Sequence, residues 1–211
     1  MKLHYFNVYG RAESLRMLFF KAKLPITEVP ITYEEWPKLK NSGFFEFNQI
    51  PVLEMSDGKK LSQTKSILRY FGTQHGFYPK DDPFNAYLVD SFIDSVDDIN
   101  PHFYKVRTEK DPELLKKAKH ELFTNTFPKW CEAIEKRLQN NVTQKYIVGN
   151  KLTIADMTYA GRYTAQVNNP LCPYKEDVEK VVDQFKNIKT WGDNMFKEFE
   201  EYHKQRPQKP F

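Results

Sequence analysis

The chain has 211 residues, which is enough for one or two compact domains with a buried core. Aromatic residues make up 15% of it, which argues against disorder, and 32 basic against 28 acidic residues leave a net charge of only +4, which does not indicate a nucleic-acid partner. No segment approaches the roughly 20 apolar residues of a membrane span, and no apolar leader follows Lys2, so we expect a cytoplasmic protein with no membrane attachment.

The first third of the chain predicts alternating strands and helices. Residues 2–6 indicate a strand, Gly10 leads into an apolar helix through Leu15 and Phe19, and residues 27–31 indicate a second strand. A second helix, a hairpin of two further strands and a third helix follow. A βαβ unit followed by a ββα unit is typical of a thioredoxin-like sheet with helices packed on it.

Residues 49–64 carry the most functional information in the chain. Pro51 and the apolar residue before it lead into a predicted short strand, and Asp57-Gly58 predicts a tight hairpin turn. Thr64 then has the side chain of a helix N-cap, with apolar residues at helical spacing behind it. Free backbone N–H groups, a hydroxyl and the positive end of the helix dipole would together form a small anion site.

A boundary segment with strands and helices before it and only helices after it predicts two domains and the fold class α+β. Residues 1–75 would form the thioredoxin-like domain, and residues 76–83, which combine glycine, two prolines and charge, would form a linker. Residues 84–211 would form an all-helical domain. The tail from Lys204, rich in lysine and proline, is expected to be mobile.

Several local signals define helix ends in the second domain. Pro101 should end or kink the first helix, and Asp111 should begin the next one, with proline at its first turn. Thr153 and Asp156 form a predicted capping box. Cys131 and Cys172 have no cysteine or histidine at metal-ligand spacing, so we expect inert thiols and no metal site.

Five sequence motifs stand in one order along the chain. They are Leu3-His4-Tyr5-Phe6 with Gly10-Arg11-Ala12-Glu13, Glu35-Trp36-Pro37-Lys38-Leu39-Lys40, Gln49-Ile50-Pro51-Val52-Leu53, Gln63-Thr64, and Gly149 with Leu152-Thr153-Ile154-Ala155-Asp156. In this order and spacing they resemble the cytosolic glutathione transferases of the sigma, mu, pi and alpha group, and the sigma class most closely. The clearest departure is Thr64, where the family more often has serine; threonine keeps the hydroxyl.

Catalysis in such a protein requires a reactive thiolate. A free thiol has a pKa near 8.5, so only a few per cent of it is ionised at neutral pH. A tyrosine hydroxyl that donates a hydrogen bond to the sulfur favours the ionised form. Tyr5 ends the first strand just before a helix, and the resemblance implies that it is this residue, with Arg11 adding positive charge nearby. Tyr9 and Ser14 are rival hydroxyls.

Glutathione also carries two carboxylates that need partners. The helix start at Gln63 and Thr64 suits the γ-glutamyl carboxylate. Trp36 and Lys40 lie four residues apart and hence on one face of a short helix. The resemblance implies that their indole N–H and ammonium groups hold the glycyl carboxylate.

The remaining contacts with glutathione also follow from the resemblance. Val52 would offer its backbone to the cysteinyl moiety in the manner of an added strand, which requires a cis peptide bond before Pro51. Gln49 is a weaker contact. In the family an acid beyond the linker reaches the γ-glutamyl ammonium from the partner subunit of a homodimer, and the register favours Asp98 over Asp97 for this role.

Two further features concern the dimer and the second substrate. Phe47 stands where related classes place an aromatic that inserts into the other subunit, although a local contact with its neighbours explains it equally well. A hydrophobic electrophile would lie between the domains. Possible wall residues are His102, Phe103, Tyr104 and Arg107 on the helical side and Tyr9 on the other.

The resemblance therefore implies a glutathione S-transferase that uses glutathione as cosubstrate and needs no other cofactor. Two alternatives stay open. One is a glutathione-dependent isomerase such as a prostaglandin D synthase of the sigma class, although the tryptophan of that pocket falls near Tyr104 or Lys105 here. The other is a non-catalytic binding or structural protein like the crystallins that resemble sigma transferases.

Overall fold

The structure is a computed structural model that describes residues 1–210. Its N-terminal part is built on one four-stranded sheet with the order β2-β1-β3-β4. The strands are β1 (Lys2–Phe6), β2 (Thr27–Ile31), β3 (Val52–Glu54) and β4 (Lys60–Ser62). β1 runs parallel to β2 and antiparallel to β3, so that Leu3 lies opposite both Glu28 and Leu53. Leu3 and Tyr5 alternate as the buried residues of β1, as the pleat requires.

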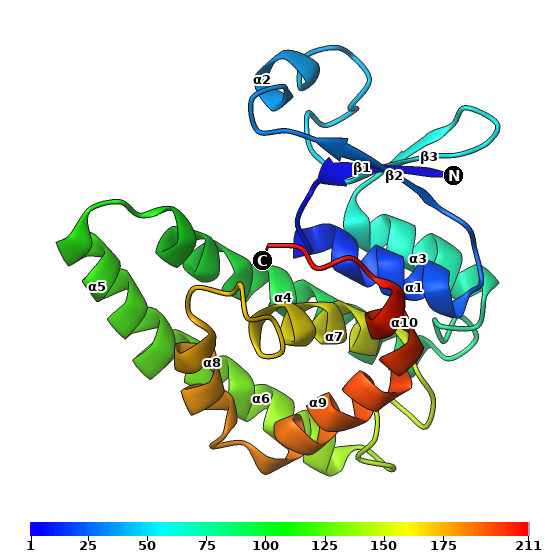
Figure 1. Cartoon of the computed structure of the whole chain (residues 1–211). Coiled ribbons are helices and arrows are strands. Elements are labelled where there is room, and N and C mark those ends of the chain that lie inside the picture. Colours follow the sequence, from blue (N-terminus) through cyan, green and yellow to red (C-terminus); the bar gives the residue numbers. More distant parts are fainter. Residues whose placement is uncertain (211) are drawn as a thin grey trace.

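Helices flank the sheet on both sides (Figure 1). The 3₁₀ turn η1 (Gly10–Ala12) leads into α1 (Glu13–Lys21), and α1 packs with α3 (Thr64–Gln74) between the sheet and the helical part of the chain. The short helix α2 (Trp36–Leu39) lies on the other side of the sheet. The strand and helix order confirms the thioredoxin-like prediction.

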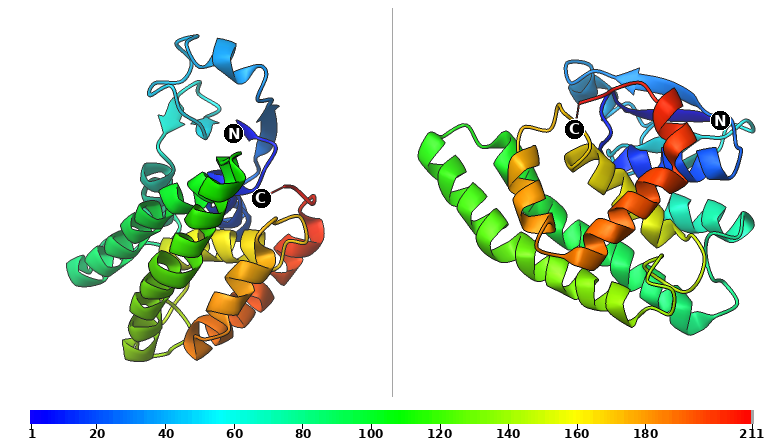
Figure 2. Two further views of the ribbon diagram at one scale, coloured as in Figure 1. Left: turned by 90° about the vertical axis from the view of Figure 1, so that its left-hand side faces the viewer. Right: turned by 60° about the horizontal axis from the view of Figure 1, so that its bottom comes forward.

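The C-terminal part is entirely helical, which confirms the predicted α+β class (Figures 1 and 2). Its helices are α4 (Pro83–Thr108), α5 (Pro112–Glu121), the π-helical turn η2 (Leu122–Thr126), α6 (Phe127–Asn140), α7 (Ile154–Gln166), α8 (Lys175–Val182), α9 (Lys186–Glu198) and α10 (Glu200–Gln205). None of the helices within residues 1–210 combines the length and the apolar character needed to cross a bilayer.

Two predicted helix starts in the C-terminal part are formed by the expected side chains. Asp111 accepts backbone hydrogen bonds from Glu113 at 2.9 Å and Leu114 at 3.0 Å. Thr153 and Asp156 form the predicted capping box of α7. Of the two outcomes expected at Pro101, a helix end or a kink, the helix end is wrong, because α4 continues through Pro101 to Thr108. Burial of neighbouring turns of α4 holds the helix together although proline removes one backbone donor.

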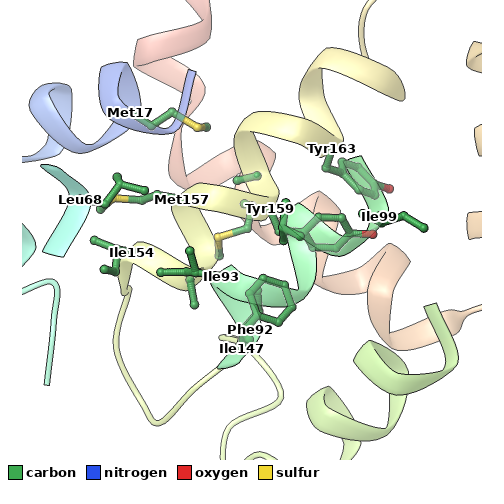
Figure 3. Packing of buried hydrophobic residues seen from close by; sticks show 14 of the residues in the cluster. Met17, Leu68, Phe92, Ile93, Ile99, Ile147, Ile154, Met157, Tyr159 and Tyr163 are labelled. Atoms are coloured by element: carbon green, nitrogen blue, oxygen red, sulfur yellow. The ribbon is translucent and has the colours of Figure 1, made fainter. Parts of the chain in front are cut away.

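The core is continuous across the two parts of the chain (Figure 3). α7 is its centre, with Tyr159 stacked on Trp191 at a ring separation of 4.7 Å. Met157 of α7 lies near Met17 of α1 and Leu68 of α3 in the same cluster. α1 approaches α7 closely because Gly161 has no side chain; a Cβ there would lie 3.1 Å from the backbone nitrogen of Ser14.

The C-terminal tail is docked, which differs from the expected mobile segment. The backbone N–H of Tyr9 donates to the carbonyl of Pro210 at 3.0 Å, and the Asn169 side chain donates to the carbonyl of Lys209 at 3.3 Å. Arg206 forms an ion pair with the buried Glu13. These partners lie far away in sequence, so the composition of the tail could not reveal them. Phe211 lies outside the described residues.

Candidate active site

A cavity of about 550 Å³ lies between the sheet domain and the helices. The N-terminal part contributes Tyr5, Gly10, Arg11, Ser14, Gln49, Pro51, Gln63 and Thr64 to its lining, and the helices contribute Val96, Asp97, Asn100, Phe103, Tyr104, Arg107 and Arg162. A volume of this size is typical of small-molecule sites, which range from about 300 to 1,000 Å³. Most of the predicted site residues are therefore brought together around one space.

Tyr5 lies at the end of β1 with its side chain in the cavity lining. Its hydroxyl oxygen accepts a hydrogen bond from the backbone N–H of Arg11 at 3.0 Å. Burial raises the pKa of Tyr5, although the Arg11 N–H and nearby arginines oppose this shift. The phenol is therefore neutral at pH 7, and its proton is free to donate toward the cavity.

Gly10 makes room for that hydroxyl. Its φ of +43° lies in the left-handed region, which glycine adopts without the steric penalty of other residues. A Cβ at this position would lie only 2.6 Å from the Tyr5 oxygen. Gly10 is thus a site residue for steric reasons, and the sequence reveals only its place in the turn before α1.

The two rival hydroxyls lie in different surroundings. Ser14 lines the cavity and donates to the carbonyl of Arg11 at 3.3 Å. Tyr9 is buried away from the cavity lining, where its hydroxyl donates to the carbonyl of Pro207 at 3.4 Å and the Arg206 guanidinium covers its ring at 4.2 Å. Tyr9 therefore contacts the tail, and its expected place in the wall is wrong.

The start of α3 differs in one respect from the prediction. Thr64 is the first helical residue, and the N-cap is Gln63, whose φ of +69° is a strained value for a residue with a side chain. Residue preferences favour threonine as an N-cap but cannot reveal this unusual backbone. The side-chain amide of Gln63 donates to Gln49 at 3.3 Å, and all three residues line the cavity.

Three predicted glutathione contacts lie outside the cavity lining. Trp36 packs edge-on against Phe45 with ring centres 5.1 Å apart, and Lys40 is exposed just after α2. Val52 is fully buried in β3, opposite His4 on one side and Ser62 on the other. The peptide bond between Ile50 and Pro51 is cis, as expected.

The two acids of α4 have different surroundings. Asp97 lines the cavity, forms an ion pair with Lys65 at 2.8 Å and accepts a hydrogen bond from Asn100 at 3.0 Å. Asp98 is exposed and does not belong to the lining. Within one subunit it is therefore Asp97 that lies near the Gln63 side of the cavity.

The helical wall contains three of the residues that were expected there. Phe103, Tyr104 and Arg107 line the cavity, whereas His102 does not. Sequence reasoning missed Arg162, which projects from α7 into the same wall. The available signal was the single basic residue of α7.

The remaining reactive groups offer no second site. Within residues 1–210, no group of three or more histidine, cysteine or acidic side chains could hold a metal ion. Cys131 and Cys172 are both buried free thiols, and burial raises the pKa of each. A buried thiol with a raised pKa is a poor nucleophile at neutral pH.

Comparison with known protein families agrees with the geometry. Residues 1–73 match the family model "Glutathione S-transferase, N-terminal domain", and residues 97–206 match "Glutathione S-transferase, C-terminal domain". Glutathione S-transferase A of Cavia porcellus is 38% identical over 156 residues, which cover 74% of this chain and 70% of that protein. A glutathione S-transferase of Anopheles gambiae is 32% identical over 197 residues, which cover 90% and 94%. Other curated relatives are named as alpha-class proteins.

Solved structures show the same architecture. Monomeric Na-GST-3, a glutathione S-transferase of the hookworm Necator americanus, superposes with a TM-score of 0.82 at 30% identity, covering 100% of this chain and 98% of that one. A prostaglandin synthase D of Nilaparvata lugens gives a TM-score of 0.83 at 24% identity, with 98% of each chain covered, and shares the fold.

The chain joins a thioredoxin-like domain to a helical domain, and a cavity lies between them. Together with the family matches, this arrangement defines a glutathione-dependent class of enzymes. The chain belongs to the glutathione S-transferase family. Members of this family bind glutathione and hydrophobic substrates, which fits a cavity lined by both polar groups and apolar side chains.

Proposed function

We propose that Tyr5 holds the sulfur of glutathione as a thiolate, which then attacks a hydrophobic electrophile bound against the helices. The observation that carries this proposal is the hydrogen bond from the Arg11 N–H to the Tyr5 oxygen, because it leaves the phenol proton free for the sulfur. Lowering a thiol pKa by two units requires about 2.7 kcal/mol of preferential anion stabilisation. One hydrogen bond to a charged group contributes about 1.5–3 kcal/mol, and the positive charge of Arg11 adds to it.

The glutathione backbone would lie along the N-terminal wall of the cavity. The γ-glutamyl carboxylate would bind at Gln63 and Thr64, where the first N–H groups of the eleven-residue helix α3 are free. Gln49 would contact the same moiety through its bond to Gln63.

Trp36 and Lys40 would hold the glycyl carboxylate at the far end of the peptide, and the backbone of Val52 would bind the cysteinyl part. These three assignments rest on the motif order, since the residues lie beyond the cavity lining. The proposal includes no metal or organic cofactor besides glutathione.

The test is Tyr5→Phe. We expect conjugation to fall by about tenfold to a hundredfold, because one hydrogen bond to the thiolate is lost, while retention on immobilised glutathione persists. The pKa of enzyme-bound glutathione, followed by thiolate absorbance against pH, should rise. An unchanged rate and thiolate pKa would transfer the role to Ser14 or Arg11.

Within the family we propose the sigma class, supported by the five motifs and their spacing. A prostaglandin isomerase is the second candidate, and the shared fold with a prostaglandin synthase favours testing it. Assays with electrophiles and with prostaglandin precursors separate the two activities. Retention on immobilised glutathione without turnover of either substrate type would favour the crystallin-like alternative.

We also propose a cytoplasmic homodimer whose active sites share residues. One support is Asp98, which is exposed on α4 and does not line the cavity of its own subunit. The other is Phe47, which is 52% exposed. An isologous dimer would bring Asp98 toward the partner's glutathione site. Sedimentation at micromolar concentration is the direct measurement, and a fully active monomer, the assembly described for Na-GST-3, would contradict the shared site.

A further inference from the structure

The C-terminal tail lies against the loop that joins β1 to η1 (Figures 1 and 2). This loop, residues 7–9, leads directly to Gly10 and Arg11. The backbone N–H of Arg11 donates to the Tyr5 hydroxyl oxygen at 3.0 Å. The tail therefore contacts the segment of backbone that carries the hydrogen-bond donor of the proposed catalytic phenol.

Tyr9 is the residue of this loop that the tail holds. Its backbone N–H donates to the carbonyl of Pro210 at 3.0 Å, and its hydroxyl donates to the carbonyl of Pro207 at 3.4 Å. The Arg206 guanidinium lies over its ring at 4.2 Å, and only 3% of Tyr9 is exposed. The tail thus restrains both the backbone and the side chain of Tyr9, one residue before Gly10.

Arg16 of α1 holds the same loop through hydrogen bonds to its backbone. Its Nη1 donates to the carbonyls of Val8 and Tyr9 at 3.1 Å each. Arg16 also forms ion pairs with Glu13 at 3.1 Å and with Glu28 at 2.7 Å. The position of the loop is therefore connected to two acidic side chains.

The same two acids bind the tail. Glu13 forms an ion pair with Arg206, and Glu28 lies 3.3 Å from the ammonium of Lys209. The side chain of Asn169 adds a hydrogen bond to the Lys209 carbonyl at 3.3 Å. The loop and the tail are thus held by one network of ionic contacts and hydrogen bonds.

Lys209 is the buried anchor of the tail. Only 7% of it is exposed, whereas the residues on either side of it are exposed. Lysine is almost never fully buried unless it is paired, and breaking a buried ion pair is strongly unfavourable. Loss of the pair between Lys209 and Glu28 should therefore release the end of the tail, and with it the acceptor of the Tyr9 N–H.

The tail has no strong direct electrostatic effect on Tyr5. The charges that act most on the Tyr5 hydroxyl belong to Arg11 of η1, Arg16 of α1 and Arg107 of α4. Since none of these belongs to the tail, an effect of Lys209 on Tyr5 has to pass through the position of the loop.

We propose that Lys209 is a positioning residue for catalysis. By anchoring the tail on Glu28 it holds Tyr9 in place, and this fixes the Arg11 N–H that aims the Tyr5 hydroxyl at the glutathione sulfur. Catalytic groups depend on such supporting contacts, because a displacement of about 0.5 Å already weakens their geometry. The inference rests on the proposed role of Tyr5.

Lys209→Glu tests the inference, because it places a second carboxylate beside Glu28 and should undock the tail. Exchange of the Tyr9 amide with deuterium should become about tenfold faster or more, since the amide loses the Pro210 carbonyl. The pKa of enzyme-bound glutathione should rise by about half a unit to one unit.

The pH profile separates positioning from a loss of folded protein. At saturating glutathione, kcat/KM for 1-chloro-2,4-dinitrobenzene should fall by about threefold to tenfold at about pH 6. At about pH 9 the bound thiol is ionised in both proteins, so the difference should disappear. A purely structural defect would lower the rate equally at both pH values.

Lys204→Glu is the matched control. It makes the same change of charge on α10, where the Lys204 side chain is 59% exposed and pairs with Glu200 and Glu201. Its amide exchange, thiolate pKa and rate should equal those of the unaltered chain. Lys209→Arg keeps the charge and should retain most of the rate at about pH 6.

Three results would each overturn the inference. They are an unchanged thiolate pKa in Lys209→Glu, whatever the exchange of the Tyr9 amide; an equal loss of rate at both pH values; and an equal effect of Lys204→Glu.

Tyr5→Phe distinguishes this failure from failure of the proposed function. An unchanged rate and thiolate pKa in Tyr5→Phe would contradict the role of Tyr5 and the inference together. Impairment in Tyr5→Phe but not in Lys209→Glu would contradict the positioning role alone. In the double variant the thiolate pKa should equal that of Tyr5→Phe, and a further rise would contradict an action of Lys209 through Tyr5.

Discussion

Replacing Gly10 with alanine tests the geometry around Tyr5 without touching the phenol itself. The new Cβ would lie 2.6 Å from the Tyr5 oxygen and 3.2–3.3 Å from two ring carbons, so the ring must move. It would be displaced from the Arg11 N–H, which now lies 3.0 Å away, and with it from the expected position of the sulfur.

Two separate effects contribute to the expected magnitude. Alanine at a φ of +43° destabilises the folded chain by about 1–2 kcal/mol, because a Cβ is disfavoured in the left-handed region. Loss of a well-placed hydrogen bond to a thiolate raises the reaction barrier by about 1.5–3 kcal/mol. We therefore expect kcat to fall by about tenfold to a hundredfold, with KM for glutathione changed much less.

Gly58→Ala is the control. Gly58 has a φ of +85°, and a Cβ there would meet nothing within 4 Å, so this variant has backbone strain without the clash. Both variants should lower the midpoint of urea unfolding, and only Gly10→Ala should raise the pKa of bound glutathione and slow conjugation of a neutral electrophile. Equal kinetics in the two variants would refute the assigned position of the Tyr5 hydroxyl.

Three further predictions follow from the contacts described above. Thr64→Ala should raise KM for glutathione by about fivefold to tenfold with an unchanged melting temperature, because Thr64 is not the N-cap of α3; a fall of several degrees would contradict this. Arg206→Ala should lower the free energy of unfolding by about 1–3 kcal/mol in urea titrations, because it removes a partner of the buried Glu13, and an unchanged midpoint would argue against tail docking in solution. Burial favours a raised pKa for Glu28, but its bonds with Arg16 and Lys209 lower it below 4.5, so its contribution to stability is present above that pH and lost as the pH falls further. In Glu28→Gln, stability measured from about pH 5 toward pH 3 should therefore decline less steeply than in the unaltered chain.

Local signals made most of the fold predictable. The alternation in β1, the Asp57-Gly58 turn and the Thr153–Asp156 capping box depend on residues close together in sequence, and all three agree with the structure. Tyr5 and Arg11, which stand only six positions apart in the sequence, likewise both lie in the cavity lining.

Features that depend on distant partners were not predictable. The tail docks because Glu13 and Glu28, almost two hundred residues earlier, offer it carboxylates. Tyr9 was expected in the wall because its side chain suits a binding site, yet the same tail covers it.

Two glycines, Gly72 in α3 and Gly161 in α7, allow the sheet domain and the helices to meet without a gap. A Cβ at Gly72 would lie 2.8 Å from Ile154, and one at Gly161 would lie 3.1 Å from the Ser14 nitrogen. Each surface is thus shaped to the other at the level of single methyl groups. Recombination between related genes would therefore produce hybrids that fold only when both halves inherit this fit. The two domains must then evolve as one unit, even though each corresponds to its own family model.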